Sequence, residues 1–178
     1  PRDMINAVPA APHPVTRAGE SLVPMERIQA AATDVIARIN AAKRPIIWVG
    51  HGARSMNYGE RLMAFAQATG MPMVESVMGK GAVDESDPLV LGVYVGAGST
   101  QELREYVESV DLVVEVGVSI NDITTGAFTA SIPPENRIHM SAIGTKVEHR
   151  FYEGVDLAGI AHALERRIGE ITRNAVPD

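Results

Sequence analysis

The sequence predicts an α/β fold: a three-layer, doubly wound, Rossmann-like domain with a mostly parallel sheet and helices on both faces. Short apolar runs alternate along the chain with segments of helical periodicity, which is typical of βαβ units with right-handed crossovers. The run 112–116 has three valines in five residues and lies between Asp111 and Gly117. Such a run indicates a strand buried on both faces, as in the middle of a parallel sheet.

The composition limits the class of protein. A chain of 178 residues is long enough for one well-filled domain. The net charge of −6, without a basic cluster, argues against nucleic acid or an anionic membrane as a partner. The absence of cysteine excludes disulfides, thiolate metal sites and a cysteine nucleophile. No apolar run reaches the roughly 18 residues of a membrane span and no signal peptide is visible, so we expect a cytoplasmic protein.

The first 24 residues differ in character from the rest. Residues 1–24 contain five prolines and no apolar periodicity, so they are predicted to form an interdomain linker or arm. The domain is predicted to occupy residues 25–178. The first residue is Pro1, which suggests a fragment of a longer chain.

The elements of the domain follow from spacing and from residues that begin or end helices. A first helix is predicted from Met25, with Pro45 as its limit, and a second over 57–69, ended by Gly70. A third begins at a capping box formed by Ser99 and Glu102. The last is capped by Asp156 and has an apolar face that extends to Ile171. Residues 77–98 are rich in glycine and are predicted to be irregular. Strands are predicted at 46–49, 72–75, 112–116 and 137–141, with a short edge strand at 146–152.

Gly50 and Gly52 stand where a nucleotide-binding turn would lie, between a first strand and a helix. Glycines there let the backbone approach a pyrophosphate, and Glu75 ends the second strand where a ribose-binding carboxylate belongs. The third glycine of that motif is replaced by Ser55, so a tight turn that binds nothing is the favoured alternative. We expect His51 to be a loop or interface residue.

The remaining polar residues give no complete catalytic or metal site. Lys80 lies between two glycines but lacks the rest of a phosphate-binding loop, and is expected to be a loop lysine. Asn121 and Asp122 could bind a ligand at the sheet edge; capping of backbone amides is the favoured alternative. The acids at 84–85 are expected to be solvated. No histidine spacing fits a metal site, so neither catalytic nor metal-binding residues are predicted.

Four segments together resemble the central domain of thiamine diphosphate-dependent enzymes, most closely the pyruvate, indolepyruvate and branched-chain 2-oxo acid decarboxylases. The opening PRDM also resembles the exit from the pyrimidine-binding domain that precedes it in that family. The four segments are IIWVGHG at 46–52, MGKGAVDESDPLVLGVYVG at 78–96, VESVDLVVEVGVSINDITTGAF at 107–128 and NRIHMSAIGTKVEHRFYEGVDL at 136–157.

The resemblance implies that the intact enzyme holds thiamine diphosphate and Mg²⁺ in its pyrimidine- and diphosphate-binding domains. This sequence has no GDG motif and no glutamate that matches the cofactor-activating one, so no cofactor and no catalytic residue are expected in it. The implied partners are those two domains, a small 2-oxo acid substrate, and further copies of the chain in a homo-oligomer (dimer or tetramer).

The resemblance also implies that some relatives with this fold bind FAD or ADP. Those relatives carry an arginine where this chain has Ser119 and an acid where it has Ser141, so the two departures favour the decarboxylase branch.

Three hypotheses remain open. The first is a decarboxylase central domain with a structural, assembly or regulatory role, inactive alone. The second is a domain that binds NAD, FAD or ADP, and the third is the central domain of an acetolactate synthase or oxidase. For the second hypothesis, the residues that could form a vestigial nucleotide site are Gly50, Gly52, Gly117 and Asp122.

Overall fold

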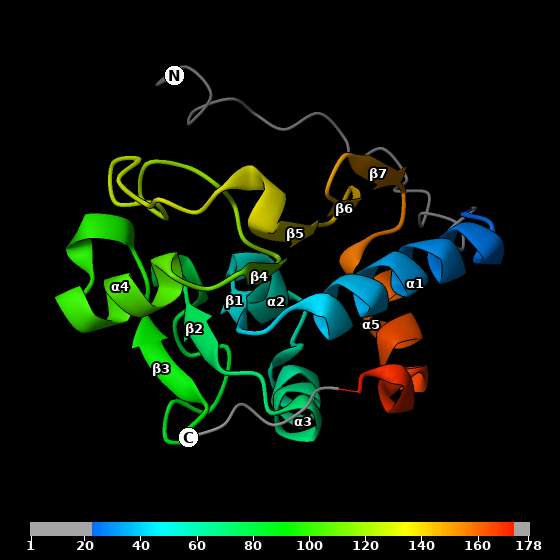
Figure 1. Ribbon diagram of the computed structural model, residues 1–178, viewed down its shortest axis with the longest axis horizontal. Helices are drawn as coiled ribbons and strands as arrows, with labels where there is room; N and C mark the ends of the chain where they lie inside the picture. Colours follow the sequence, from blue (N-terminus) through cyan, green and yellow to red (C-terminus); the bar gives the residue numbers. More distant parts are fainter. Residues whose placement is uncertain (1–22, 173–178) are drawn as a thin grey trace, which may run out of the picture.

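The computed structural model describes residues 23–172 (Figure 1). The arm predicted for residues 1–24 therefore falls outside the described residues, apart from Val23 and Pro24. Among the residues described, no helix combines the length and apolar character needed to cross a bilayer.

A single seven-stranded sheet organises the domain, in the order β3-β2-β1-β4-β5-β6-β7. The first five strands in that order are parallel, and β6 and β7 join antiparallel at one edge. The strand β4 occupies the centre and is buried along its whole length, which confirms the prediction for 112–116. The strands are β1 (Pro45–Val49), β2 (Met73–Glu75), β3 (Val90–Val93), β4 (Leu112–Val116), β5 (Arg137–Met140), β6 (Gly144–Val147) and β7 (Arg150–Glu153).

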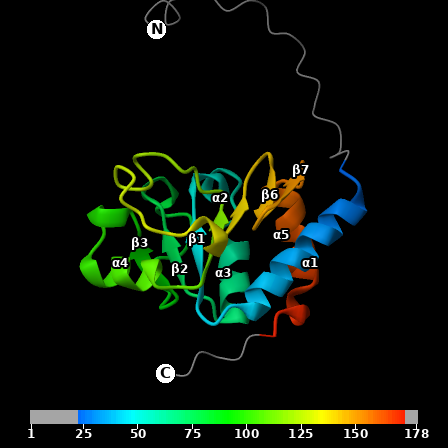
Figure 2. The same cartoon turned by 45° about the horizontal axis from the view of Figure 1, so that its top comes forward.

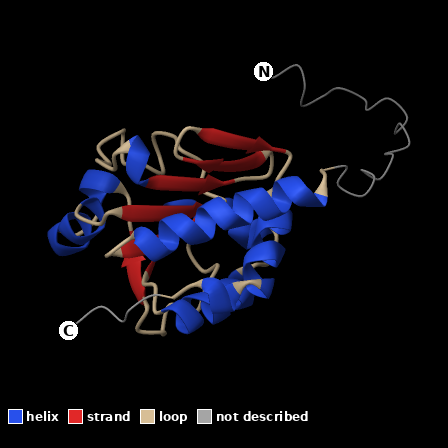
Figure 3. Ribbon diagram, turned by 45° about the vertical axis from the view of Figure 1, so that its right-hand side comes forward, coloured by secondary structure: helices blue, strands red, loops and turns tan. Residues whose placement is uncertain are grey.

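Helices cover both faces, so the predicted three-layer α/β fold is confirmed. On one face, α1 (Met25–Ala41), α3 (Gly59–Thr69) and α5 (Leu157–Arg166) enclose the larger apolar core. Figure 3 shows α1 crossing in front of the strands. On the other face, α4 (Gln101–Glu108) and residues 118–132 cover a smaller cluster around Trp48 and Tyr94. The short helix α2 (His51–Ser55) begins directly after β1.

The predicted irregular segment 77–98 contains a strand, β3, that the sequence did not reveal. Gly92 in this strand has φ +126°, a backbone angle that residues with a side chain rarely adopt. The strand β3 pairs with β2 through an irregular register. Glycine within a strand weakens the sequence pattern by which the strand could be predicted. The strand β3 therefore forms through its pairing with β2. The predicted single strand 146–152 is also corrected, to the hairpin β6–β7 with Glu148 at its turn.

Two helix boundaries also differ from the prediction. The cap of α4 is Thr100, whose hydroxyl accepts a hydrogen bond from the amide of Leu103. The predicted cap Ser99 instead accepts from the amide of Val95, which closes the preceding turn. Asp156 caps α5 as predicted, by accepting from the amide of Gly159. However, α5 ends at Arg166 and a short 3₁₀ turn follows it.

Asp111 fixes the connection between α1 and β1, and its replacement tests that role. Its two carboxylate oxygens accept from the amides of Lys43 at 2.7 Å and Arg44 at 2.8 Å. Burial alone would raise the pKa of Asp111, but these two amides hold it below its ordinary value. We expect Asp111→Asn, which offers one acceptor in place of two, to lower the free energy of unfolding by about 1–2 kcal/mol at neutral pH.

The lowered pKa of Asp111 determines how its contribution to the free energy of unfolding changes with pH. A lowered folded-state pKa means that the stabilisation is present above the unfolded value, 3.8, and is lost as the pH falls through the folded value. The difference between the two proteins in urea unfolding should therefore shrink in acid. Asp84→Asn is the control, since the Asp84 carboxylate accepts from Ser86 within its own loop and joins no separate elements. An equal loss in both variants would contradict the role given to Asp111.

Candidate functional site

The residues singled out by the sequence gather at the carboxyl ends of the parallel strands. α2 follows β1, a 3₁₀ turn (Val77–Gly79) follows β2, and a long loop follows β4. In Figure 2 this loop arches at the top of the view, on the side where α2 lies. In open α/β sheets this edge is where ligands bind, so the geometry of each predicted residue decides what the edge can hold.

Gly50, Gly52 and Gly117 are brought together, backbone against backbone. The amide of Gly50 donates to the carbonyl of Val116 at 2.9 Å, and the amide of Gly52 donates to the carbonyl of Gly117 at 2.9 Å. A Cβ atom on Gly50 would overlap the carbonyl of Gly117. The Gly52 amide, which would face a pyrophosphate in a nucleotide-binding turn, is therefore already engaged. These glycines join α2 to the end of β4.

Glu75 lies at the end of β2 but is turned into the protein. It is fully buried, and its Oε1 accepts from the amide of Ala82 at 3.1 Å. Its Oε2 has no hydrogen-bond partner among the described residues. Burial raises the pKa of Glu75, although the Ala82 amide opposes the shift. A carboxylate in this position does not reach out of the sheet edge toward a ribose.

Replacement of Glu75 should change the pH dependence of stability. Because the pKa of Glu75 is raised on folding, its contribution is complete below the unfolded value of 4.5 and is lost as the pH rises through the folded value. We expect Glu75→Gln to raise the free energy of unfolding by about 1–2 kcal/mol near pH 8, with no gain near pH 4.

Thermal unfolding across this pH range measures the difference between Glu75→Gln and the original chain. Glu170→Gln is the matched control of opposite sign, since the ion pair with Arg167 lowers the pKa of the exposed Glu170. A Glu75→Gln difference that did not vary with pH would contradict the account.

Asn121 and Asp122 shape the loop after β4. The Oδ1 atom of Asn121 accepts from the amide of Thr124 at 2.8 Å, and that of Asp122 accepts from the amide of Ile123 at 2.9 Å. These are the backbone contacts that the favoured alternative predicted. Asp122 is exposed, and the described residues contain no group of three or more acids and histidines, with or without Asp122, that could hold a metal ion.

Glu115 and His139 form a pair that the sequence analysis missed. Glu115 lies within the apolar run of β4, with only 2% of its side chain exposed, and β5 places His139 directly beside it. The Nδ1 atom of His139 lies 2.7 Å from Oε2 of Glu115, and Arg137 approaches Oε1 at 3.5 Å. His139 and Arg137 thus give the buried Glu115 carboxylate its polar partners. The sequence signal for this pair was an acid inside a β-branched run, but the identity of its partner depends on the register of β4 and β5.

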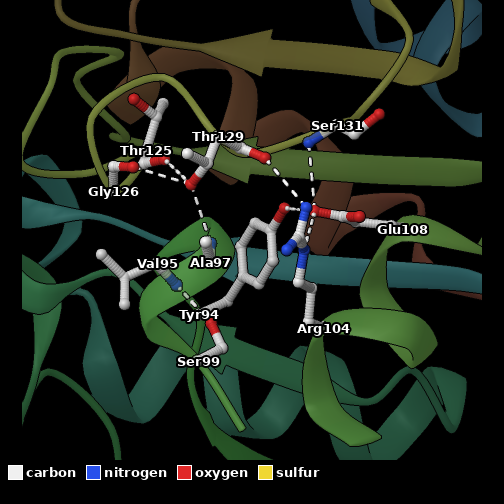
Figure 4. A network of polar contacts seen from close by, with 10 residues as sticks. All are labelled: Tyr94, Val95, Ala97, Ser99, Arg104, Glu108, Thr125, Gly126, Thr129 and Ser131. Carbon is white, nitrogen blue, oxygen red and sulfur yellow. Dashed lines mark hydrogen bonds and ion pairs between the residues drawn. The ribbon is translucent and has the colours of Figure 1, made fainter. Parts of the chain in front are cut away.

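Figure 4 shows a polar network that anchors the loop after β4 to α4. The Oε1 atom of Glu108 accepts from the hydroxyl of Tyr94 at 3.0 Å, from Nε of Arg104 at 3.0 Å and from the amide of Ser131 at 3.1 Å. The hydroxyl of Thr129 accepts from the amide of Ala97 and donates to the carbonyl of Gly126. Burial and Glu108 together raise the pKa of Tyr94, which keeps its phenol protonated as a donor.

Two hollows in the described part of the protein lie away from Gly50, Gly52 and Gly117. One, of about 530 Å³, is lined by residues of mixed charge, including Asp34, Arg38 and Arg150. Another, of about 40 Å³, is apolar and lies between α3, α5 and the sheet, beside the ion pair of Arg61 with Glu165. Neither is lined by Gly50, Gly52, Gly117 or Asp122.

A diphosphate held through a metal ion does not fit the described residues. They contain no group of three or more histidines, aspartates or glutamates that could hold a metal ion. The amide best placed for a phosphate, that of Gly52, already has a partner.

Comparisons with protein-family models and with known proteins point to the same family. Residues 32–166 match the model of the thiamine pyrophosphate enzyme central domain. The chain is 32% identical over 143 residues to a pyruvate decarboxylase of Aspergillus fumigatus, which covers 80% of this chain and 25% of the relative. It is 33% identical over 144 residues to a pyruvate decarboxylase of Candida glabrata, covering 81% of this chain and 24% of the relative. It thus spans about a quarter of the length of these relatives.

Proposed function

Because the chain belongs to the family of the thiamine pyrophosphate enzyme central domain, we propose that it is the central domain of a thiamine diphosphate-dependent 2-oxo acid decarboxylase. The observation that carries the proposal is the similarity to pyruvate decarboxylases over four-fifths of the chain. In the parent enzyme the cofactor would supply the electron sink for decarboxylation.

The role proposed for this domain is structural, in assembly or regulation, without activity of its own. The described residues provide no metal-binding group, and the relatives are about four times longer than the matched region. Thiamine diphosphate and Mg²⁺ would be bound by the pyrimidine- and diphosphate-binding domains of the parent chain. We propose that this parent is a cytoplasmic homo-oligomer, a dimer or tetramer.

The test compares two proteins: the 178-residue chain and the full-length chain that contains it. Each is supplied with thiamine diphosphate, Mg²⁺ and either pyruvate or phenylpyruvate, and CO₂ and aldehyde are measured. The proposal expects aldehyde and CO₂ from the full-length chain only. Turnover by the 178-residue chain would refute the proposal that this domain is inactive without the rest of the parent enzyme. Formation of acetolactate by the full-length chain would identify a synthase parent instead.

Nucleotide binding is a separate test on the 178-residue chain. Since the Gly52 amide is engaged and Glu75 is buried, we expect calorimetric titration with NAD, FAD and ADP to show dissociation constants weaker than about 100 µM, or roughly −5.5 kcal/mol. Tighter binding of any of the three would restore the nucleotide-binding hypothesis.

A further inference from the structure

A cavity lies inside the larger core, in the space between α3, α5 and the sheet. Its volume is about 40 Å³ and its surface is apolar. The floor is formed by Ile47, Val114, Val116 and Met140, which are buried side chains on β1, β4 and β5. Protein interiors leave few voids larger than a water molecule, so a cavity of this size in the core requires an explanation.

The cavity is associated with one small side chain on α5. Leu157, Ala161 and Glu165 are spaced by four residues, so they lie along one line of the helix, and all three line the cavity. Ala161, in the middle of this line, is the smallest of the lining side chains, and α3 contributes Leu62 and Phe65 to the same lining. The methyl group of Ala161 leaves the space between the two helices unfilled.

An ion pair stands at the mouth of the cavity. The Nε atom of Arg61 on α3 donates to Oε1 of Glu165 on α5 at 2.6 Å, and Nη2 of Arg61 donates to Oε2. The Arg61 guanidinium also lies over the ring of Tyr58, 4.9 Å from its centroid. A surface hollow of about 200 Å³ adjoins the pair, and Arg61, Phe65 and Glu165 line both the hollow and the cavity. The ion pair therefore separates the cavity from the hollow.

The chemistry of the walls defines the class of ligand. A buried water molecule needs polar partners, so an apolar cavity stays dry. The two charged groups in the lining, Arg61 and Glu165, pair with each other, so a charged ligand would lose its hydration without gaining a counter-charge. An uncharged apolar ligand would instead supply the dispersion contacts that the walls lack.

We propose that this cavity is a binding site for a small uncharged apolar molecule, which enters from the surface hollow past the Arg61–Glu165 pair. The volume restricts the ligand to a few non-hydrogen atoms, since a cavity that holds benzene has about 150 Å³ and this one has about 40 Å³. The proposal is independent of the proposed function, because it requires neither a cofactor nor another domain.

Xenon, an uncharged apolar atom, is the probe for the site. The 178-residue chain is isotopically labelled at its methyl groups, and NMR spectra are recorded at increasing xenon pressure. We expect saturable shifts in the methyl signals of Leu62, Val114 and Leu164, which line the cavity. The methyl signals of Val107 and Val113, in the smaller cluster on the other face of the sheet, are the internal control and should not shift. Benzene should shift none of these signals.

Filling the cavity tests its position. Ala161→Leu places a larger apolar side chain in the space, so we expect the saturable shifts to disappear. Ala68→Leu is the matched control, because it makes the same change at an exposed position of α3 that does not line the cavity, and it should bind xenon as the original chain does. The Tm of each variant shows whether it is folded, and Ala161→Val, a smaller change, takes the place of Ala161→Leu if the latter does not fold.

The route past the ion pair is tested by the rate of xenon exchange, measured by saturation transfer in xenon NMR. Glu165→Gln keeps the shape of the side chain and removes its charge, so exchange should quicken about twofold to fivefold, the factor that corresponds to the strength of an exposed ion pair. Glu170→Gln is the matched control, because it removes the exposed ion pair with Arg167, and neither residue lines the cavity or the hollow. It should leave the exchange rate unchanged.

Four results would contradict the proposal. Methyl shifts that rise linearly with xenon pressure, or that appear equally on both faces of the sheet, would show that xenon dissolves in the protein without a site. Undiminished binding in a folded variant of Ala161 would place the site elsewhere. Saturable shifts with benzene would contradict the size of the ligand. Equal exchange rates in Glu165→Gln and the original chain would refute entry past the ion pair.

Discussion

Substitution of Gly117 by alanine is expected to lower the free energy of unfolding by about 3–5 kcal/mol, the range of the most damaging single changes. Gly117 has φ +64°, and a Cβ atom there would lie 2.6 Å from the nitrogen of Ala53 and 2.7 Å from Cα of Gly52. These are backbone atoms at the start of α2 and cannot rotate away. The substitution must therefore separate α2 from the end of β4.

Gly70→Ala separates the two causes of the Gly117 effect. Gly70 has the same φ of +64°, but an added Cβ would meet nothing within 4 Å. Its replacement should cost only the conformational penalty of about 1–2 kcal/mol. Both variants are measured by urea unfolding at one pH. Similar losses at the two sites would show that the contact between the glycine backbones contributes little.

The fold could be predicted from the sequence because the strongest signals are local. β1 is a continuous apolar run, β4 is interrupted only by Glu115, and each strand is buried along its whole length. The strand β3 lacks such a signal, because Gly92 interrupts it and its burial is incomplete. Its existence depends on pairing with β2, which is a property of the assembled sheet.

The candidate site shows why a glycine pattern does not identify a ligand. A turn that approaches a pyrophosphate and a turn that packs on another backbone both require the absence of a Cβ atom. Gly50 and Gly52 meet the second requirement by contacting Gly117, a residue far away in sequence. Likewise, Glu115 and His139 become partners only once β4 and β5 pair in register.

Removal of the Glu108 carboxylate is the second substitution with a large expected effect. We expect Glu108→Ala to lower the free energy of unfolding by about 2–4 kcal/mol, because one oxygen accepts from Tyr94, Arg104 and Ser131. Tyr94 is fully buried, so its hydroxyl would lose its acceptor where water has little access. Tyr94→Phe removes one of the three hydrogen bonds without leaving a donor unpaired, and should cost about 1 kcal/mol.

Glu105→Ala is the matched control for Glu108→Ala on the same helix. Glu105 is exposed and accepts from Gln101 one turn earlier in α4, so its loss should cost less than about 0.5 kcal/mol. Equal losses for the two glutamates would show that the effect belongs to the helix and not to the network.

Hydrogen exchange locates the consequence of Glu108→Ala within the chain. The carboxylate joins α4 to Ser131, and Arg104 reaches the carbonyl of Thr129 at 3.3 Å. Because these contacts hold the second half of the loop after β4, exchange at the Ser131 amide should quicken more than exchange in β4 itself. The same loop presents the exposed Phe128, so Glu108 links the packing of α4 to the position of this residue. Uniform acceleration throughout the domain would contradict this link, since it would indicate a loss of global stability alone.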